Sequence, residues 1–180
     1  MHLFSFIIPF TLYRAKTAKG TLIEVREIFG HKKLDLDGYP QSGSTYQKYW
    51  KNIFVKAKIA ELPDKGKALV LGLGGGDLAK ILEKTKPKWK TVFVELEPEI
   101  VDVARKYFGI VNHSNRSLIT ADARSYMERN KDKFDVVIVD LYSGDSVPDF
   151  VTSRKFLKQV GLAIKPKGIA IFNYASHSFR

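Results

Sequence analysis

The sequence contains no cysteine among its 180 residues. This absence excludes disulfide bonds, thiolate metal ligands and a cysteine nucleophile, and it fits a reducing compartment. Long hydrophobic runs are also lacking: the apolar stretch at residues 3–13 has about half of the ~20 residues that a membrane-spanning helix needs. Its basic residues follow it rather than precede it, which argues against a secretory signal. We therefore expect a cytoplasmic protein without a membrane partner, and we interpret residues 3–13 as a buried strand or as a surface that pairs with another chain.

Histidine is scarce, and its four occurrences show no metal-binding spacing such as HExxH. The serines Ser143, Ser146 and Ser153 lack the context of a nucleophile elbow. We therefore expect neither a metal ion nor a serine hydrolase.

Acidic residues are outnumbered, with 19 Asp and Glu against 30 Lys and Arg and a net charge of +11. Such an excess is typical of proteins that bind nucleic acid, anionic membranes or acidic proteins. The lysines are scattered near expected turns, for example at residues 84–90 and 131–133, which also fits a solvated surface. Nucleic acid is thus a partner that the charge allows but that we do not favour.

The length and the hydrophobic content of 44% indicate one main domain with its own core. Residues 1–44 alternate apolar and polar residues around glycine turns, which predicts a small β-rich region with antiparallel strands. Residues 45–61 carry apolar residues at helical spacing, and Pro63 ends that pattern.

From residue 67 onward the pattern alternates between strand and helix. The expected strands are KALVLGLG, KTVFVELE, SLITAD, FDVVIVD and GIAIFNYAS. Strands that alternate with helices predict an α/β fold with a doubly wound parallel sheet.

In such sheets ligands bind at the carboxyl ends of the strands, and here acids follow four successive strands. They are Asp77 after the glycine turn, Glu95, Asp122 and Asp140. Because Asp77 directly follows Gly76, the turn is not the dinucleotide fingerprint G-x-G-x-x-G. The recurrence of acids at one edge favours a ligand site there.

The spacing of these acids indicates the ligand. Glu95 lies about 20 residues beyond the glycine turn, where an acid meets the ribose hydroxyls of a nucleotide-like ligand. A carboxylate at Asp77 would repel a pyrophosphate at the same helix N-terminus and would favour a cationic ligand. S-adenosylmethionine and its decarboxylated form meet both conditions.

Each acid also has a purely structural interpretation. Asp77 and Asp122 would serve as helix N-caps, Glu95 would pair with a surface lysine, and Asp140 would be a residue of a turn. These interpretations stay open at the level of sequence.

Five segments, in order, resemble motifs of the spermidine synthases, the polyamine aminopropyltransferases within the S-adenosylmethionine methyltransferase superfamily. They are LDLDGYPQS, LGGGD, VELEPEIVDVARKYF, ADARSYM and FDVVIVDLYSGDSVP, within about Leu34 to Tyr174. The resemblance implies a Rossmann-like class I methyltransferase fold over residues 45–180. It also implies a transferase that moves an aminopropyl group from decarboxylated S-adenosylmethionine to a polyamine amine.

The resemblance further implies a role for each matched residue. Asp140 matches the acid that orients the attacking amine and takes up its proton, Asp77 the acid that holds the amine of the donor, and Glu95 the acid that holds the ribose. Asp122 and Ala123 match the adenine edge, and Gln41 the region near the donor or the acceptor. The remaining candidates are Gly72, Gly74, Gly75 and Gly76 around the donor and Tyr49, Tyr142 and Asp145 for the substrate.

The sequence departs from the family pattern at three points. Tyr46 and Tyr49 are not in register with the acceptor-site tyrosine that follows the family's glutamine. Ser143 stands where the family has a second loop acid, with Asp145 two residues further on, and the family continues through strands beyond Arg180. We therefore expect a C-terminally short sheet whose uncovered edge favours a homo-oligomer, such as a dimer. Two alternatives stay open: a methyltransferase that uses S-adenosylmethionine on nucleic acid or another anionic substrate, and a non-catalytic binding or assembly module on the same fold.

Overall fold

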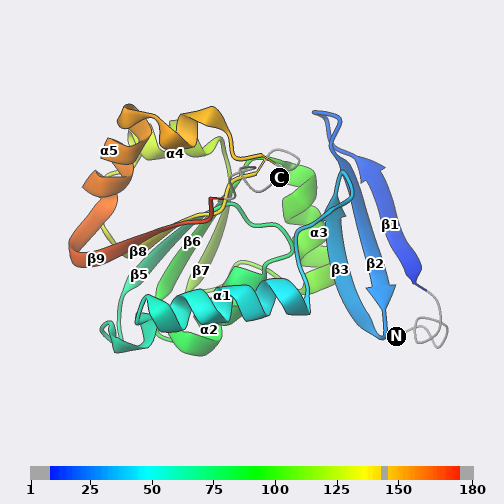
Figure 1. Cartoon of the computed structure of the whole chain (residues 1–180), viewed down its shortest axis with the longest axis horizontal. Helices are drawn as coiled ribbons and strands as arrows, with labels where there is room; N and C mark the ends of the chain where they lie inside the picture. Colours follow the sequence, from blue (N-terminus) through cyan, green and yellow to red (C-terminus); the bar gives the residue numbers. More distant parts are fainter. Residues whose placement is uncertain (1–8, 143–145, 175–180) are drawn as a thin grey trace, which may run out of the picture.

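The computed structural model of the chain describes residues 9–142 and 146–174, which form two sheets (Figure 1). The N-terminal sheet is antiparallel with the order β1-β2-β3-β4. Its strands are β1 (Phe10–Lys16), β2 (Leu22–Ile28), β3 (His31–Leu36) and β4 (Tyr39–Pro40). Ile28 pairs with His31 across a two-residue turn in which Phe29 and Gly30 both have positive φ, as a tight hairpin requires. The predicted antiparallel strands are confirmed.

The apolar N-terminal stretch differs from our expectation of a buried strand. Residues 1–8 lie outside the described part of the chain, and β1 is an edge strand on which Phe10 is 47% exposed. Leu12 and Tyr13 of β1 are half-buried against the core that the antiparallel sheet shares with α3, so the strand is not buried along its length. Pairing of this surface with another chain stays a prediction.

The second sheet is parallel and has the order β7-β6-β5-β8-β9. Its strands are β5 (Lys67–Leu71), β6 (Lys90–Glu95), β7 (Arg116–Thr120), β8 (Phe134–Val139) and β9 (Ile164–Phe172). The chain moves outward from β5 to β7 and then returns to β8, so the strand order reverses between β5 and β8. Ligands of open α/β sheets bind at this reversal.

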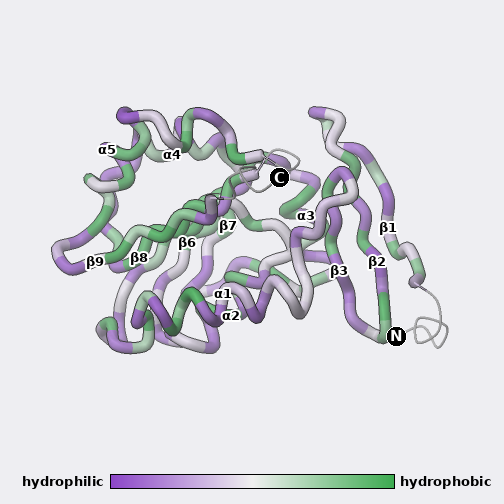
Figure 2. The backbone as a smooth tube through the Cα atoms, in the orientation of Figure 1, coloured by the Kyte–Doolittle hydropathy of each residue, from purple (hydrophilic) through white to green (hydrophobic). Residues whose placement is uncertain are grey.

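Helices cover both faces of the parallel sheet (Figure 1). One face packs against α1 (Ser44–Lys56), α2 (Asp77–Thr85) and α3 (Pro98–Phe108), and the other against α4 (Ala123–Arg129) and α5 (Arg154–Ala163). Along β5, Ala68 and Val70 face the first group while Leu69 and Leu71 face the second. Figure 2 shows the hydrophobic residues concentrated along these strands, as expected for a sheet that is buried on both faces. The predicted α/β fold with a doubly wound parallel sheet and an N-terminal β-rich region is confirmed.

Helix α3 packs against both sheets. Its Val101 and Ala104 belong to the core beneath the parallel sheet, whereas Ile100 and Val103 pack against the antiparallel sheet. The antiparallel sheet contributes Ile23, Val25 and Leu34 to that contact. Because the two parts share this core, their division at residue 44 stays a prediction.

Two element boundaries differ from the sequence interpretation. The helix expected over residues 45–61 ends at Lys56, because Lys58 adopts the left-handed conformation with φ 53°, and a short 3-10 turn η2 (Ile59–Glu61) follows. The last strand begins at Ile164, directly after α5, rather than at Gly168. A further 3-10 turn, η3 (Asp149–Thr152), precedes α5. Among the described residues, no helix is long and apolar enough to cross a membrane.

Candidate functional site

A cavity of about 540 Å³ lies at the carboxyl ends of the parallel strands. The strand ends contribute Gly72, Glu95, Ala121 and Asp140, and α1 contributes Tyr46 and Trp50. The antiparallel sheet closes another side with Lys19, Thr21 and Leu36. Both sheets therefore contribute walls to one cavity at the reversal of the strand order.

The first glycines of the turn after β5 bring the backbone to the cavity wall. Gly72 has φ +102°, and a Cβ atom there would lie 2.1 Å from the backbone oxygen of Asp140. Gly74 has φ +51°, and its Cβ atom would lie 3.1 Å from the backbone oxygen of Gln41. Gly72, Gly74 and Gln41 all line the cavity. The lack of a side chain at the two glycines thus lets the turn pack against the backbone of Asp140 and Gln41 at the cavity wall.

The other two glycines of the turn serve packing. A Cβ atom on Gly75 would lie 2.5 Å from the Cβ atom of Ser42, and one on Gly76 would lie 2.3 Å from the Cγ1 atom of Ile110. The described cavity lining does not include them. The structure places Gly75 and Gly76, two candidates for the donor site, against protein side chains, and their role toward the donor stays a prediction.

Asp77 is the first residue of α2, and it is buried beside the cavity. Its Oδ1 atom accepts a hydrogen bond from Nε2 of Gln47 at 2.7 Å, and its Oδ2 atom accepts one from the backbone N–H of Gly43 at 2.8 Å. The N-cap of α2 is Gly76, so the N-cap interpretation of Asp77 is wrong. The carboxylate instead ties the start of α1 to the glycine turn and faces the cavity.

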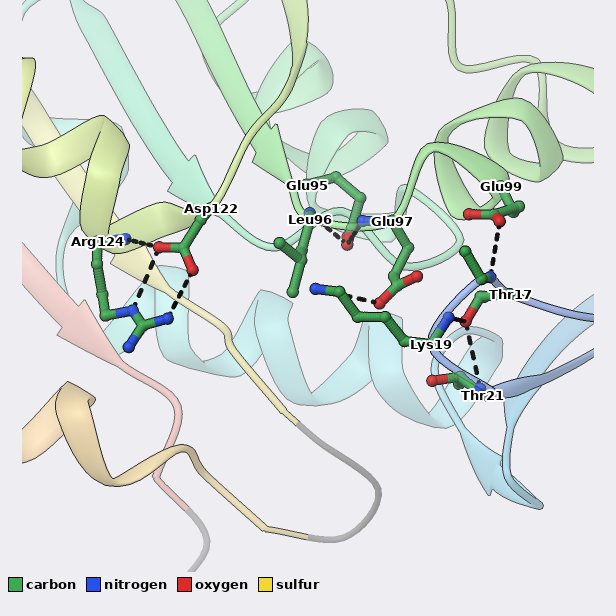
Figure 3. Close-up of polar contacts among 10 residues, drawn as sticks. Thr17, Lys19, Thr21, Glu95, Leu96, Glu97, Glu99, Asp122 and Arg124 are labelled. Atoms are coloured by element: carbon green, nitrogen blue, oxygen red, sulfur yellow. Dashed lines mark hydrogen bonds and ion pairs between the residues drawn. The ribbon is translucent and has the colours of Figure 1, made fainter.

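Glu95 ends β6, and its carboxylate is held by backbone N–H groups (Figure 3). Oε2 accepts from Leu73 at 3.0 Å, and Oε1 accepts from Leu96 at 2.7 Å and from Glu97 at 3.2 Å. Burial raises the pKa of this carboxyl group, and the backbone hydrogen bonds oppose that rise. These partners are backbone groups, so the interpretation of Glu95 as the partner of a surface lysine is wrong.

Asp122 is the N-cap of α4, as the structural interpretation expected, and it also lines the cavity. It accepts hydrogen bonds from the backbone N–H groups of Arg124 at 2.7 Å and Ser125 at 3.2 Å. The side-chain hydrogen bond from Arg124 is the main reason that the pKa of Asp122 is lowered. Ala123 and Arg124 line the cavity beside it. Figure 3 shows the guanidinium group of Arg124 against the carboxylate of Asp122.

Asp140 directly follows β8, and its backbone N–H continues the ladder by donating to Leu71 at 2.9 Å. Its Oδ1 atom accepts a hydrogen bond from Nδ2 of Asn173 at 2.8 Å. Burial raises the pKa of this carboxyl group to about 6, the Asn173 hydrogen bond opposes the rise, and the charge of Glu95 adds to it. A carboxyl group with this pKa is largely ionised at pH 7 and accepts protons more readily than an exposed aspartate.

The three substrate candidates have different positions. Tyr142 lines the cavity, and its hydroxyl donates to the backbone oxygen of Asn173 at 3.2 Å. Tyr49 lies outside the described lining, and its hydroxyl donates to Oδ1 of Asn173 at 3.1 Å. Asp145, like Ser143, lies outside the described residues.

The sequence interpretation missed several residues of the site. Tyr46 lines the cavity from α1, and burial raises the pKa of its hydroxyl, yet in the sequence it belongs to an ordinary helical apolar face. Asn173 follows β9 and contacts Asp140, so the rule that selected the acids at strand ends would have found it if extended to polar residues.

Lys19 reaches the cavity from the turn between β1 and β2 (Figure 3). Its Nζ atom lies 3.8 Å from Oε1 of Glu97, and the neighbouring backbone N–H of Ala18 donates to Oε1 of Glu99 at 2.9 Å. These contacts attach the antiparallel sheet to the start of α3. No motif in the sequence indicates them, because they depend on how the two sheets pack.

Among the described residues, no group of three or more His, Asp or Glu side chains is placed to hold a metal ion.

Comparison with known proteins identifies the family to which these features belong. The model of the spermine/spermidine synthase domain matches residues 53–178. The polyamine aminopropyltransferase of Vibrio vulnificus (strain CMCP6) is 28% identical over 131 residues, which are 69% of this chain and 44% of the relative. The polyamine aminopropyltransferase of Pyrobaculum neutrophilum is 30% identical over 163 residues, which are 81% of this chain and 56% of the relative. The chain thus spans about half the length of these curated relatives.

Solved structures with the same fold include a probable spermidine synthase from Corynebacterium glutamicum. It has a TM-score of 0.79 and 22% identity, with 95% of this chain and 65% of that chain covered. Human methyltransferase-like protein 13 in complex with SAH has a TM-score of 0.64 and 23% identity, with 76% of this chain and 67% of that chain covered. At these identities the likeness shows the fold.

Proposed function

Because this chain belongs to the spermine/spermidine synthase domain family, we propose that it transfers an aminopropyl group from decarboxylated S-adenosylmethionine to an amine of a polyamine. The observation that carries the proposal is the convergence of Asp77, Glu95, Asp122 and Asp140 on one cavity beside a glycine turn. The relatives described as polyamine aminopropyltransferases support the same reaction.

The donor would lie along the carboxyl ends of β5, β6 and β7. Oε1 of Glu95 accepts two backbone hydrogen bonds and Oε2 accepts the one from Leu73, so Oε2 would be the atom that accepts from a ribose hydroxyl. Asp122 and Ala123 would face the adenine, and Gly72 and Gly74 would let the ligand approach the backbone. The carboxylate of Asp77 would attract the amine of the aminopropyl arm.

In the proposed reaction, the lone pair of a neutral amine attacks the carbon next to the sulfonium sulfur. A C–N bond forms, the C–S bond breaks, and its electron pair stays on sulfur, which leaves methylthioadenosine. The nitrogen must lose a proton, because a primary amine has a pKa of ~10.4 in water. Asp140, with its pKa of about 6, would orient the amine and accept the proton for release to water. A carboxylate is a weak base for an amine, so its positioning and its charge contribute more than its proton affinity.

The charge distribution supports a cationic ligand despite the net charge of +11. Lys19 and Arg124 are the cationic side chains among the described residues of the cavity lining, and each lies beside a carboxylate, Glu97 and Asp122 respectively. Asp77 and Asp140 have neutral hydrogen-bond donors instead, so their charges stay available to a polyamine and to the donor amine. Local acids of this kind determine which small ion enters a cavity, even on a basic protein.

Our proposal also covers the compartment, the oligomeric state and the domain division of the protein. We place it in the cytoplasm, in a homo-oligomer such as a dimer, with residues 1–44 as an N-terminal unit beside the nucleotide-binding domain of residues 45–180. Neither the donor nor the acceptor requires a metal ion for this displacement.

Calorimetric titration of the purified protein with decarboxylated S-adenosylmethionine, S-adenosylmethionine and methylthioadenosine tests the donor. We expect the decarboxylated form to bind more tightly than the intact form, because Asp77 and Asp140 would repel the carboxylate of the latter. Preference for the intact form would support a methyltransferase instead. Absence of binding by all three ligands would support a non-catalytic module.

A further inference from the structure

Asn173 lies where the last strand of the parallel sheet meets the candidate base. Its backbone N–H donates to the carbonyl of Val139 at 2.9 Å, which continues the pairing of β9 with β8 by one residue. Asn173 is therefore placed beside Asp140, the residue that follows Val139. The residue is 9% exposed, so its polar atoms need partners within the protein.

The side-chain amide of Asn173 interacts with Asp140 and with two tyrosines of α1, Tyr46 and Tyr49. Its Nδ2 atom donates to Oδ1 of Asp140 at 2.8 Å, and its Oδ1 atom accepts from the hydroxyl of Tyr49 at 3.1 Å. The two bonds define one orientation of the amide, because the reversed amide would place its oxygen against the carboxylate. Tyr49 and Tyr46 thus hold the amide, and the amide holds Asp140.

The backbone of Asn173 holds a third residue of the site. Its carbonyl oxygen accepts from the hydroxyl of Tyr142 at 3.2 Å. Asp140 and Tyr142 line the cavity, whereas Asn173 and Tyr49 do not belong to the described lining. Asn173 is therefore placed to act on a ligand through its neighbours.

We propose that Asn173 is a positioning residue that holds Oδ1 of Asp140 and leaves Oδ2 for the acceptor amine. The inference rests on the proposed aminopropyl transfer, in which Asp140 receives that amine. If the carboxylate rotated freely, its lone pairs would point toward the amine only part of the time. A carboxylate held at Oδ1 keeps one lone-pair direction of Oδ2 toward the amine.

The charges around Asp140 are consistent with this role. Asn173 and Glu95 act on its carboxyl group, and the charge of Asp140 in turn raises the pKa of the hydroxyls of Tyr46 and Tyr49 on α1. Burial and Glu95 raise the pKa of Asp140, and the hydrogen bond from Asn173 lowers it. Removing the amide N–H would therefore raise the pKa and shift the onset of activity to higher pH.

Asn173→Asp provides a sharp test because the side chain keeps its shape. It replaces the N–H donor with an oxygen, and two carboxylates at this distance share one proton, which raises the apparent pKa of the pair. Asn112→Asp is the matched control. Oδ1 of the exposed Asn112 accepts from the backbone N–H of Leu118, and aspartate keeps that acceptor.

Two measurements decide the proposal. The first is the pH profile of kcat for aminopropyl transfer, in which we expect Asn173→Asp to reduce the rate at pH 7 by about tenfold or more and to move the acid limb to higher pH. The second is the NMR titration of the Asp140 carboxyl carbon in the free protein, in which we expect the same upward shift. The Kd of methylthioadenosine and the profile of Asn112→Asp should match the wild type.

An unshifted acid limb and an unshifted titration in Asn173→Asp would overturn the proposal. If Asn173→Asp does not fold, Tyr49→Phe replaces it, because loss of the hydroxyl releases the amide and should shift both profiles in the same direction by a smaller amount. If the wild-type protein shows no transfer, the proposed function fails. The NMR titration then still shows whether Asn173 controls the protonation of Asp140.

Discussion

A Cβ atom on Gly72 would lie 2.1 Å from the backbone oxygen of Asp140, so the first glycine of the turn touches the backbone of the candidate base. The two residues follow β5 and β8, the neighbouring strands between which the strand order reverses. The contact places the donor turn and Asp140 against each other. A residue with a side chain at position 72 would force these strand ends apart.

Gly72→Ala tests this close approach. We expect it to lower the free energy of unfolding by about 2–4 kcal/mol, because the methyl group overlaps backbone atoms and alanine disfavours positive φ. The control is Gly109→Ala at the end of α3, which also has positive φ but has no atom within 4 Å of the added Cβ. Gly109→Ala should lower the free energy of unfolding by about 1 kcal/mol. Equal losses for the two variants in urea denaturation would show that the contact with Asp140 has no energetic effect.

Asp140→Asn should abolish most of the transfer while it leaves nucleoside binding intact. The amide cannot accept the proton of the amine, so we expect kcat to fall by about 100-fold or more. The Kd of methylthioadenosine should change less than about threefold, since the nucleoside lies near Glu95 and Asp122 in our proposal. Asp64→Asn, at an exposed residue, is the control. Nearly unchanged turnover in Asp140→Asn would remove Asp140 from the mechanism.

The pH dependence follows from the pKa of Asp140, which burial raises to about 6. A carboxyl group whose pKa is higher in the folded than in the unfolded state binds an extra proton when folded. Its contribution to stability is therefore present at low pH and is lost as the pH rises from about 4 to 6. We expect the rate of transfer to rise over the same range as the carboxylate forms.

Thermal unfolding and initial rates from pH 4 to 8 check this sign. Asp140→Asn should gain stability relative to the wild type as the pH rises, and it should lack the acid limb near pH 6. If Asp140→Asn unfolds at a lower temperature than the wild type at pH 8, this result would contradict the burial of an ionised Asp140.

Glu95→Gln should weaken nucleoside binding and destabilise the loop after β6. The glutamine oxygen can replace one acceptor atom, but its NH₂ group would face backbone N–H donors that now bind the carboxylate. We expect a loss of about 1–3 kcal/mol in stability and a Kd for methylthioadenosine raised by about tenfold or more. Glu61→Gln, on an exposed side chain, provides the control. Unchanged affinity would show that Glu95 serves the loop alone.

The parallel sheet and its acids could be predicted because each depends on local sequence. Residues 68–71 of β5 and 136–139 of β8 are continuous apolar runs, and Asp140 directly follows the second. Parallel strands then bring their carboxyl ends together without any knowledge of packing. Glu95 was found by the same reasoning, although its hydrogen bonds to the backbone were not.

The glycine turn shows what the sequence could not separate. All four glycines pack closely against other residues, but Gly72 and Gly74 also line the cavity, whereas Gly75 and Gly76 pack against Ser42 and Ile110 outside its described lining. Which of the glycines line the cavity depends on how β3 and α3 pack against the loop. Such contacts between residues distant in the sequence cannot be read from the local pattern. The same applies to Lys19, which reaches the cavity because the antiparallel sheet packs on α3. Asn173 differs from Lys19, because its strand could be predicted from the sequence. Its amide side chain is not among the acids that the strand-end pattern selects.

The central claim is the transfer of an aminopropyl group, and product analysis tests it most directly. The purified protein is incubated with decarboxylated S-adenosylmethionine and a set of diamines and polyamines, and products are measured by mass spectrometry. We predict methylthioadenosine together with an acceptor that has gained one aminopropyl group, both absent with Asp140→Asn. Formation of S-adenosylhomocysteine from S-adenosylmethionine, with no methylthioadenosine from the decarboxylated donor, would contradict the account.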